Sequence, residues 1–413
     1  MISFYLFLID FFVPLLVSLT AYFIFYGFIN LDYLYLSISF SLSIILLSVI
    51  KSYYNDYYLI HFSEKIKIAF STWIFTIFIQ LLMLNYFRLE IDLLLLSVWI
   101  LIPITLLVIK YIIMKKSKHT IESDIHLIGN HYTFNEYEIK TLENKGFLIF
   151  YHDDFNLKLI KSIKNKSLLV LNLSKKELDT VNINHYHDNN IINLDDFFEQ
   201  YLRKVNITSD YSYIFPKPFT RSSYLAKRAI DFIATTILLP ILILLIFYTF
   251  FMKKKNKIND SIFFEQKRYG LNKCSFNIIK LRTMHENSEM FGNTEKSDSR
   301  VYSFAKNIRN LRLDELPQLL NIMFGEMHLV GPRAEWIKLA DNYEKNIDHY
   351  HLRHTVRPGI TGWAQVIYRY GTDLNDAKQK FMYDLYYIKH WSIWLEIEIC
   401  FKTFLVILDK SGF

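Results

Sequence analysis

The sequence predicts a protein in three parts: an α-helical membrane bundle, a small α/β domain, and a mainly α (α+β) domain attached to a membrane. Of its 413 residues 52% are hydrophobic and 17% are aromatic, which is high for a soluble protein. Long runs with almost no charge recur along the chain and predict the membrane parts. Short strand-like runs between polar segments predict the α/β part.

Four nearly uncharged runs occupy the first 114 residues, at about 5–28, 32–50, 68–87 and 92–114. Each is near the ~20 residues that an α-helix needs to cross a bilayer. A cleaved signal peptide is the alternative for the first run, but that run lacks a basic n-region and a small-residue cleavage site. We therefore predict a four-helix transmembrane region over residues 1–118.

The basic residues predict the orientation of these helices. Three lysines lie between the second and third runs and three more follow the fourth, whereas the other two loops contain only Arg88. Since cytoplasmic loops are rich in Lys and Arg, both ends of the chain and everything after residue 115 are expected in the cytoplasm. The net charge of +7 fits lysines that face anionic lipid headgroups. A nucleic-acid-binding protein would be expected to carry a basic stripe on a folded domain, and the sequence has none.

Residues 119–203 are predicted to form a Rossmann-like α/β domain. Strand-like runs at 124–128, 146–151 and 167–173 alternate with polar, helix-compatible segments. A dinucleotide site would need G-x-G-x-x-G after the first run, but the chain continues from Gly129 with Asn, His and Tyr. We therefore expect no bound dinucleotide.

Other candidate metal or redox residues are few. His185 and His187 lie near Asp188 in an Asn-rich segment, where histidines without further ligands are usually solvated, so we expect no metal there. Cys274 and Cys400 match no metal or redox spacing and suit a reducing compartment.

A fifth apolar run spans residues 229–252, after a linker at 204–224. One interpretation is another spanning helix. Basic residues flank the run at both ends, however, and a segment that enters and leaves on the cytoplasmic face keeps both clusters inside. Pro240 lies in the middle and can kink the helix into a re-entrant hairpin, although proline also occurs in ordinary spans. On the residues alone we prefer re-entry and leave the spanning helix open.

The stretch from Gln266 to Gln365 combines adjacent carboxylates with arginines and glycines. A diphosphate substrate brings several negative charges, which Arg can bind in bidentate fashion and which Mg²⁺ held by carboxylates can neutralise. A carboxylate can also be the nucleophile of a two-step transfer. Asp314 and Glu315 are candidates for both roles. The alternative is that they only begin a helix near Pro317, where acids favour the dipole, and that the arginines contact a membrane surface.

Six blocks follow one another in this region. They are Lys227-Arg228-x-x-Asp231, Gln266-x-Arg268-x-Gly270, Lys280-x-Arg282-Thr283-Met284, Leu313 to Gln318, Gly331-Pro332-Arg333 and Pro358 to Gln365. In these blocks and their order, residues 225–413 resemble the catalytic domain of the polyprenyl-phosphate hexose-1-phosphate transferases, also called the bacterial sugar transferase or monotopic phosphoglycosyl transferase family. The four N-terminal helices and the α/β domain resemble the long form of that family.

The resemblance implies a re-entrant catalytic domain and a two-step reaction. Pro240 matches the family's helix break, and Arg228 with Asp231 would orient that helix. Asp314 would attack the β-phosphate of a UDP-sugar, release UMP and hold the sugar phosphate until undecaprenyl (polyprenyl) phosphate attacks it. Glu315 would assist proton transfer or, with Asp314, hold Mg²⁺. The implied phosphate-binding residues are Lys280, Arg282, Arg309, Arg333 and Arg357.

The resemblance also implies a location and a pathway. The protein would lie in the bacterial inner membrane, with its catalytic domain on the cytoplasmic face, and begin a repeat unit of exopolysaccharide, capsule or O-antigen. A homodimer is expected, and no side chain identifies the sugar. The family usually has Ser where this chain has Arg312, and its Asp-x-Arg-x-Thr block ends here in Tyr302. These departures concern the substrate pocket before they concern the reaction class.

A non-catalytic scaffold and a transporter are the two other functions that the sequence leaves to be compared. A non-catalytic scaffold would be expected to lack the acidic pair or the arginines, and a transporter would need polar groups inside several spans, where the chain offers little beyond Asp10. The aromatic stretch 381–391 suits either a helix at the membrane surface or a core helix. Three charged residues make a full span over 391–408 unexpected.

Overall fold

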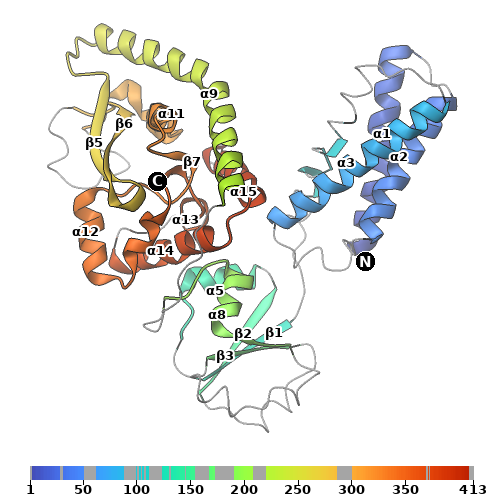
Figure 1. Ribbon diagram of the computed structural model, residues 1–413, viewed down its shortest axis with the longest axis horizontal. Coiled ribbons are helices and arrows are strands. Elements are labelled where there is room, and N and C mark those ends of the chain that lie inside the picture. The colour runs from blue at the N-terminus through green and yellow to red at the C-terminus, as the bar shows by residue number, and fades with distance from the viewer. Residues whose placement is uncertain are drawn as a thin grey trace. The chain divides into compact units, whose positions relative to one another are not determined.

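The computed structural model describes residues 2–27, 31–50, 62–87, 123–129, 132–144, 146–153, 167–172, 190–207, 220–285, 300–368 and 373–408, with Gly371 and a few positions between 99 and 110. It divides into two compact units, of which one is Met1–Ile121 with Asn144–Gly146 and the other is the rest of the chain from Glu122. Figure 1 shows the elements of the chain, which is mostly helical, with parallel sheet in the second unit.

The first unit consists of apolar helices. They are α1 (Ile2–Tyr26), α2 (Leu31–Ile50) and α3 (Phe62–Phe87), and they coincide with the first three predicted runs. The fourth run, 92–114, lies mostly outside the described residues. Helix α3 is long and apolar enough to cross a membrane. Asp10 of α1 is buried and paired with Lys110 at 2.5 Å, so an ionisable side chain within an apolar helix has an internal counter-ion.

The α/β part of the second unit contains a four-stranded parallel sheet of order β2-β1-β3-β4. Its strands are β1 (Ser123–Gly129), β2 (Phe147–His152), β3 (Leu168–Asn172) and β4 (Asn190–Asn193). The three predicted strands are therefore confirmed, and β4 is an addition. Helices α5 (Glu136–Glu143) and α8 (Leu194–Phe197), followed by the π-helix η2 (Phe198–Leu202), pack against the sheet through one hydrophobic cluster.

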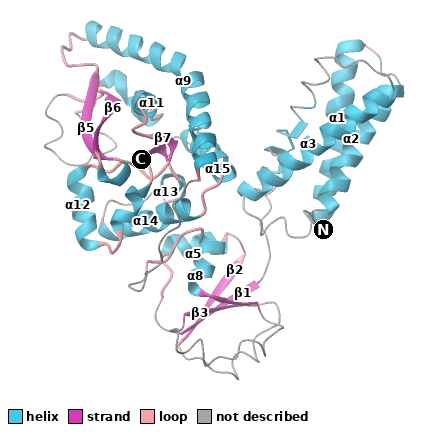
Figure 2. Cartoon of the chain, in the orientation of Figure 1, coloured by secondary structure: helices cyan, strands magenta, loops and turns pink. Residues whose placement is uncertain are grey.

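The rest of the second unit is mainly helical and includes two small sheets (Figure 2). Strands β5 (Phe263–Tyr269) and β6 (Ser275–Leu281) form an antiparallel hairpin, and β7 (His328–Val330) and β8 (Gly359–Thr361) form a short parallel pair. The helices are α9 (Arg221–Lys255), α10 (Lys306–Asn310), α11 (Gln318–Met323), α12 (Ile337–Asn346), α13 (Trp363–Ile367), α14 (Leu374–Lys389) and α15 (Ile393–Leu408), with 3-10 turns η3 (Leu271–Lys273), η5 (Ser303–Ala305), η6 (Leu313–Glu315) and η7 (Tyr350–Thr355).

Helix α9 contains the fifth apolar run and extends beyond it at both ends. It begins after Thr220, whose hydroxyl accepts a hydrogen bond from the Ser223 amide at 3.2 Å. Figure 1 shows that α9 changes direction along its length, and Pro240 lies inside it. A proline removes one backbone hydrogen bond of a helix and is a common cause of such a change.

One face of α9 is buried along the whole helix. The buried positions are Lys227, Asp231, Thr235, Leu242, Thr249 and Lys253, spaced as one helical stripe. Leu242 packs with side chains of β6 and α11. At the far end the Lys253 ammonium donates to the Ser261 carbonyl at 2.8 Å. Both ends of α9 are thus fixed to the same folded body.

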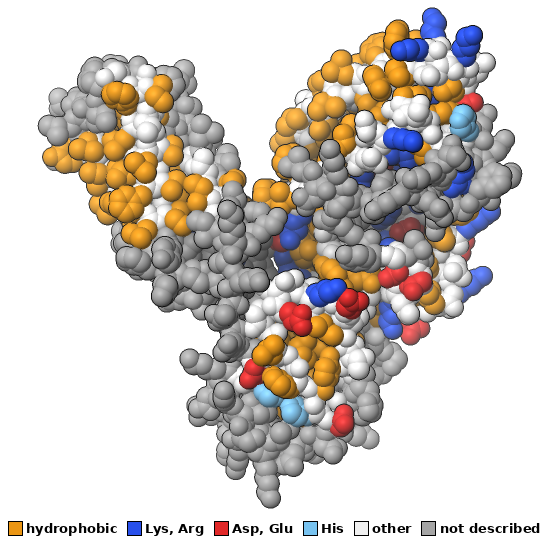
Figure 3. Space-filling view, turned by 180° about the vertical axis from the view of Figure 1, so that it is seen from behind, with side chains coloured by type: hydrophobic (Ala, Val, Ile, Leu, Met, Phe, Trp, Pro, Cys, Tyr) orange, Lys and Arg blue, Asp and Glu red, His pale blue; other side chains and the backbone are white. Residues whose placement is uncertain are grey.

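The opposite face of α9 is apolar and exposed (Figure 3). Phe232 is 74% exposed, and Leu244 and Phe247 are nearly as accessible. Contiguous apolar surface of this kind marks a contact with membrane or protein. Helix α9 is also the second helix of the described residues that is long and apolar enough to cross a membrane.

Helices α14 and α15 resolve two alternatives from the sequence. Every residue from Phe381 to Ile388 is buried, and most of them belong to the largest hydrophobic cluster, so the aromatic stretch is a core helix. In α15, Glu396 and Glu398 point inward and pair with Lys227 and Arg203. Its apolar outer face and charged inner face belong to a helix that lies on a domain.

Residues 203–207, at the end of the predicted α/β domain and the start of the predicted linker, pack into the fold. Arg203 forms a bidentate pair with Glu398, at 2.7 and 2.9 Å, and its guanidinium lies 4.2 Å from the Trp363 ring centre. Lys204 is fully buried and pairs with Glu138 of α5. These contacts join the α/β sheet to the helical part within one unit.

Candidate active site

The acidic pair lies in a 3-10 turn, one turn before α11. Arg312, immediately before this turn, adopts a left-handed conformation with φ 54° and ψ 23°, which a non-glycine residue adopts only under constraint. Pro317 then precedes the first residue of α11. The turn leaves Asp314 partly exposed and buries Glu315, so two adjacent carboxylates have different surroundings.

Glu315 is held by two cations from distant parts of the chain. The Lys280 ammonium at the end of β6 lies 2.7 Å from its carboxylate, and the Arg333 guanidinium after β7 lies 3.5 Å away. These cations hold the pKa of Glu315 well below its usual range despite burial. Glu315 therefore stays ionised.

Asp314 is affected in the opposite direction. Burial, with the negative charge of Glu315, raises the pKa of Asp314 to about 6, while Lys280 and Arg309 act to lower it. At neutral pH the group is largely a carboxylate, but a more basic one than an ordinary aspartate. Such a carboxylate, still partly accessible, is suited to nucleophilic attack.

Strand β6 is fixed in place by Asn321, a residue that the sequence did not single out. Its side-chain oxygen accepts from the Ile279 amide at 3.1 Å, and its side-chain nitrogen donates to the Asn277 carbonyl at 2.8 Å. Asn321 lies on α11, directly after the acidic pair. It therefore sets the position of Lys280 relative to Glu315.

The loop that carries Arg333 is held in place through its backbone by Arg353. This buried guanidinium donates to the Arg333 carbonyl at 3.0 Å and to Asp384 at 2.8 Å. Asp384 is itself buried, which raises its pKa to about 6. This pair could not be predicted from sequence, because Arg353 and Asp384 lie outside the recognised blocks and meet only in the fold.

Three glycines allow the blocks around Arg333 and Arg357 to touch. A side-chain carbon on Gly331 would lie 2.7 Å from the Arg357 carbonyl, and one on Gly359 would lie 2.1 Å from the Gly331 amide. One on Gly362 would lie 2.1 Å from the Gly331 carbonyl. These approaches involve backbone atoms, so larger residues would separate β7 from β8.

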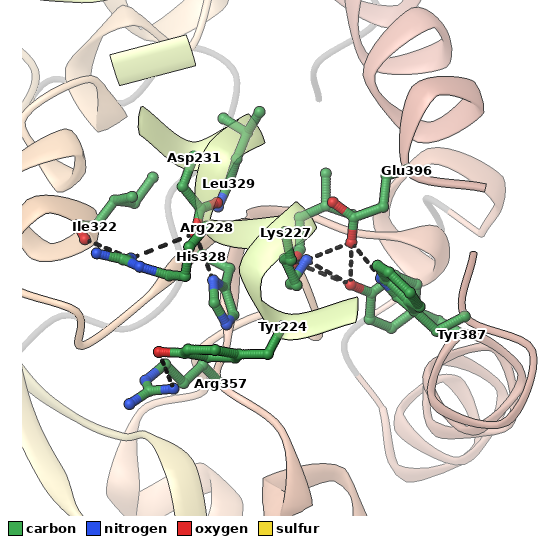
Figure 4. A network of polar contacts seen from close by, with 12 residues as sticks. Tyr224, Lys227, Arg228, Asp231, Ile322, His328, Leu329, Arg357, Tyr387 and Glu396 are labelled. Atoms are coloured by element: carbon green, nitrogen blue, oxygen red, sulfur yellow. Dashed lines mark hydrogen bonds and ion pairs between the residues drawn. The ribbon is translucent and has the colours of Figure 1, made fainter. Parts of the chain in front are cut away.

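Lys227 and Glu396 form the centre of a second polar network at the start of α9 (Figure 4). The Lys227 ammonium also donates to the Val330 carbonyl at 2.8 Å and to the Tyr387 hydroxyl at 2.9 Å. Trp391 donates to Glu396 at 2.8 Å. The network fixes α9 to β7, α14 and α15.

Asp231 extends the same network toward β7. Its carboxylate accepts from the Leu329 amide at 2.8 Å and lies 2.5 Å from the His328 ring nitrogen. Arg228 is 3.4 Å from the same carboxylate and donates to the Ile322 carbonyl at 3.0 Å. Arg228 and Asp231 thus connect α9 to α11 and β7, and they do so together with His328, which the sequence analysis did not single out.

The predicted phosphate-binding residues divide into groups by their contacts. Lys280 and Arg333 contact Glu315, and Arg309, which acts electrostatically on Asp314, donates to the Thr283 hydroxyl at 3.0 Å. Arg282 donates to the Ser261 hydroxyl at 3.1 Å and lies over Phe264, 5.8 Å from its ring centre. Arg357 donates to the Tyr224 hydroxyl at 3.2 Å.

The carboxylates present fit Mg²⁺ better than a metal that needs an all-protein site. Among the described residues there is no cluster of three His, Cys, Asp or Glu side chains that could hold a metal. Mg²⁺ is usually bound by one or two carboxylates, with waters and substrate phosphates completing the shell. Asp314 and Glu315 supply that donor set.

Comparison with known proteins identifies a family model and several relatives. A family model described as bacterial sugar transferase matches residues 222–410. The UDP-N-acetylgalactosamine-undecaprenyl-phosphate N-acetylgalactosaminephosphotransferase of Aeromonas hydrophila is 41% identical over 188 residues, 45% of this chain and 44% of that protein. The UDP-glucose:undecaprenyl-phosphate glucose-1-phosphate transferase of Escherichia coli K12 is 35% identical over 194 residues, 46% of this chain and 42% of that protein.

A shorter relative is covered almost completely. An uncharacterized sugar transferase of Bacillus subtilis, EpsL, is 36% identical over 186 residues, which are 45% of this chain and 89% of that protein. The chain therefore spans less than half the length of the two longer relatives and nearly all of the short one. The similarity lies in the part that carries α9 and the acidic pair.

Proposed function

The chain belongs to the bacterial sugar transferase family, and from that premise we propose that it transfers a hexose 1-phosphate from a UDP-sugar to undecaprenyl phosphate and releases UMP. The relatives that support this are named for UDP-N-acetylgalactosamine in one case and UDP-glucose in another, so the sugar itself is left open. We thus propose that the protein is an enzyme, and not a scaffold or a transporter.

The observation that carries the proposal is the convergence of cations on the acidic pair. Lys280, Arg309 and Arg333 come from three separate segments of the chain and surround two carboxylates that differ in pKa. Arginines and a lysine can hold the phosphates of the donor while a carboxylate attacks. A purely structural ion cluster would not need a second, partly exposed carboxylate.

In the proposed first step, Asp314 attacks the β-phosphorus of the UDP-sugar. A bond forms between its carboxylate oxygen and phosphorus, the bond from phosphorus to the bridging oxygen breaks, and UMP leaves with the electron pair. In the second step an oxygen of undecaprenyl phosphate attacks the same phosphorus. The bond to Asp314 breaks, its carboxylate is regenerated, and the product is an undecaprenyl diphosphate sugar.

Glu315 and Asp314 are the residues that would hold Mg²⁺. When bound, the ion would neutralise negative charge on the donor phosphates. Lys280 and Arg333 keep Glu315 ionised and oriented, so the site retains a negative ligand at neutral pH.

We also propose that α9 is a re-entrant membrane helix that holds the enzyme at the cytoplasmic face of the bacterial inner membrane. A helix that crossed the bilayer would separate its two ends, whereas both ends of α9 contact one folded body. Its exposed face is apolar, and basic residues follow it. The cytoplasmic face suits the donor, because nucleotide sugars are made in the cytoplasm. There the enzyme would begin a repeat unit of exopolysaccharide, capsule or O-antigen.

The test is release of UMP from a panel of UDP-sugars by membranes containing the protein, with undecaprenyl phosphate and Mg²⁺. Wild type should release UMP with one sugar, and Asp314→Asn should lose this activity by about a thousandfold or more. Asp341→Asn is the matched control, since Asp341 lies on α12 and its carboxylate accepts a hydrogen bond from the Tyr269 hydroxyl of β5 at 2.9 Å. No release with any sugar, or equal release from Asp314→Asn, would reject the proposal.

A further inference from the structure

Arg357 differs from the other candidate phosphate-binding residues in its surroundings. Its guanidinium donates to the Tyr224 hydroxyl at 3.2 Å and lies 5.6 Å from the centre of that ring. In the described part of the chain no carboxylate pairs with it, whereas Arg333 pairs with Glu315. An arginine that is half-buried without a counter-ion favours the binding of an anion.

The network around Arg357 carries an excess of positive charge. It contains three cations, Lys227, Arg228 and Arg357, and two carboxylates, Asp231 and Glu396. Glu396 is matched with Lys227, and Asp231 is shared between Arg228 and hydrogen bonds from β7. One positive charge is left, and it belongs to Arg357.

His328 adds no charge to this balance but helps to shape the site. Its ring lies against Asp231 and 6.0 Å from the centre of the Tyr224 ring. Burial lowers the pKa of His328, the hydrogen bond with Asp231 opposes this shift, and Lys227 and Arg357 act in the same direction as burial, so the net effect favours the neutral ring. In Figure 4 the guanidinium groups of Arg228 and Arg357 point to the same side of the network.

Arg357 and Arg333 lie on neighbouring backbone segments but point to different partners. The Arg357 carbonyl is where a side chain on Gly331 would collide, and Gly359 forms a bridge with Arg333. Arg333 extends to the acidic pair, and Arg357 extends to α9. The two cations thus lie on two backbone segments that are in contact, and their side chains extend to different sides of the site.

The side on which Arg357 lies is the side where the apolar helix begins. Tyr224 is in the first turns of α9, Leu225 next to it is 61% exposed, and Phe232 two turns later is 74% exposed. A ligand bound at Arg357 would have apolar surface beside it. A phosphate joined to a long hydrocarbon matches both features, and a nucleotide does not.

We propose that Arg357, braced by Tyr224, binds the phosphate of the lipid acceptor, while Lys280, Arg309 and Arg333 hold the donor. The assignment rests on the proposed function and divides its cations between the two substrates. Since the phosphate of the acceptor must reach Asp314 only after UMP has left, separate cations for the two substrates allow the second to wait without displacing the first.

The experiment separates the two halves of the reaction. Exchange of radiolabelled UMP into the UDP-sugar, with no acceptor present, reports donor binding and attack by Asp314. Arg357→Met should keep this exchange within about twofold, while its KM for undecaprenyl phosphate in the complete reaction rises about tenfold or more. Arg357→Lys should recover part of the loss, and Arg333→Met should lose the exchange itself.

Each other outcome has a definite meaning. If Arg357→Met and Arg357→Lys both lose exchange, Arg357 serves the donor and the assignment is wrong. If exchange and acceptor KM are both unchanged, it binds neither substrate. An effect of Arg357→Met that appears with phosphatidylglycerol vesicles but disappears with phosphatidylcholine vesicles would assign it to bulk anionic lipid instead. A wild type with no exchange would reject the proposed function itself, and the acceptor assignment with it.

Discussion

Glu315 and Glu396 are both buried carboxylates paired with a lysine, but the two clusters around them differ in access. At Glu396 the paired lysine is 1% exposed and the carboxylate 0% exposed, and every partner is internal. At Glu315 the cations Lys280 and Arg333 are 15% and 36% exposed. A fully buried ion pair such as Lys227 with Glu396 can only hold the fold together, whereas partly exposed cations can receive an anion. Both clusters bury charge, but only the one at Glu315 has cations that solvent and ligands can reach. We call the Lys227–Glu396 pair, which is closed to solvent, the anchor of α9.

The largest effect on stability is expected from breaking the anchor. Lys227→Met should lower the free energy of unfolding by about 3–5 kcal/mol, because Glu396 would remain buried without a counter-ion. Replacing both members, Lys227→Met with Glu396→Leu, should recover most of this loss. Thermal unfolding of the detergent-purified protein, followed by tryptophan fluorescence, measures both.

The double variant is the control for this prediction. If the single Lys227→Met variant unfolds at the same temperature as wild type, the network at α9 does not anchor the helix. If the double variant is as unstable as the single one, the loss comes from packing around the stem of the lysine and not from unpaired charge.

A smaller effect, on activity and not on folding, is expected at the open cluster. Glu315→Gln should lower UMP release by about 100-fold, or ~2.7 kcal/mol, because Lys280 and Arg333 lose their shared partner. Thermal unfolding should change far less than in Lys227→Met. The comparison of the two clusters fails if the order of these effects is reversed.

The pH dependence of UMP release sharpens the same prediction. Asp314 attacks as a carboxylate, and without Mg²⁺ its pKa is raised to about 6. Bound Mg²⁺ would lower this pKa, so release should increase with pH on the acid side and level off at or below about pH 6. In Glu315→Gln the neighbouring negative charge is gone, which lowers the pKa of Asp314. The acid limb should then move to lower pH although the plateau is reduced. A limb that stays at the same pH in both proteins would mean that another group controls it.

The long elements of the fold could be predicted because hydrophobic period and length are local properties. The runs of α1 to α3, the apolar strands β1 to β3 and the apolar segment of α9 carry that signal. Strand β4 could not be predicted, because it has only four residues and its first and last are both Asn. The pair β7 and β8 owes its contact to glycines far apart in sequence.

For the site, the sequence indicated candidate residues but not their partners. Asp314 and Glu315 stand out as neighbours, but only the fold shows that Lys280 and Arg333 share Glu315. Asn321 was missed because an Asn within an apolar helix gives no functional signal by itself. In each case the missing information is a contact between residues far apart in the chain.

The smallest effect is expected behind the site, at Arg353 and Asp384. Asp384→Asn keeps the shape of the side chain but removes the charge that orients Arg353 beneath the Arg333 carbonyl. Arg333 should then hold the donor less well, so KM for the UDP-sugar should rise about fivefold to tenfold with kcat little changed. Steady-state kinetics measure both constants. Because the acidic pair Asp314 and Glu315 is unchanged in this variant, a fall in kcat with constant KM would mean that Asp384 acts in the chemical step. Lys273→Ala, which breaks an exposed pair with Glu344, should leave both constants unchanged and serves as the matched control.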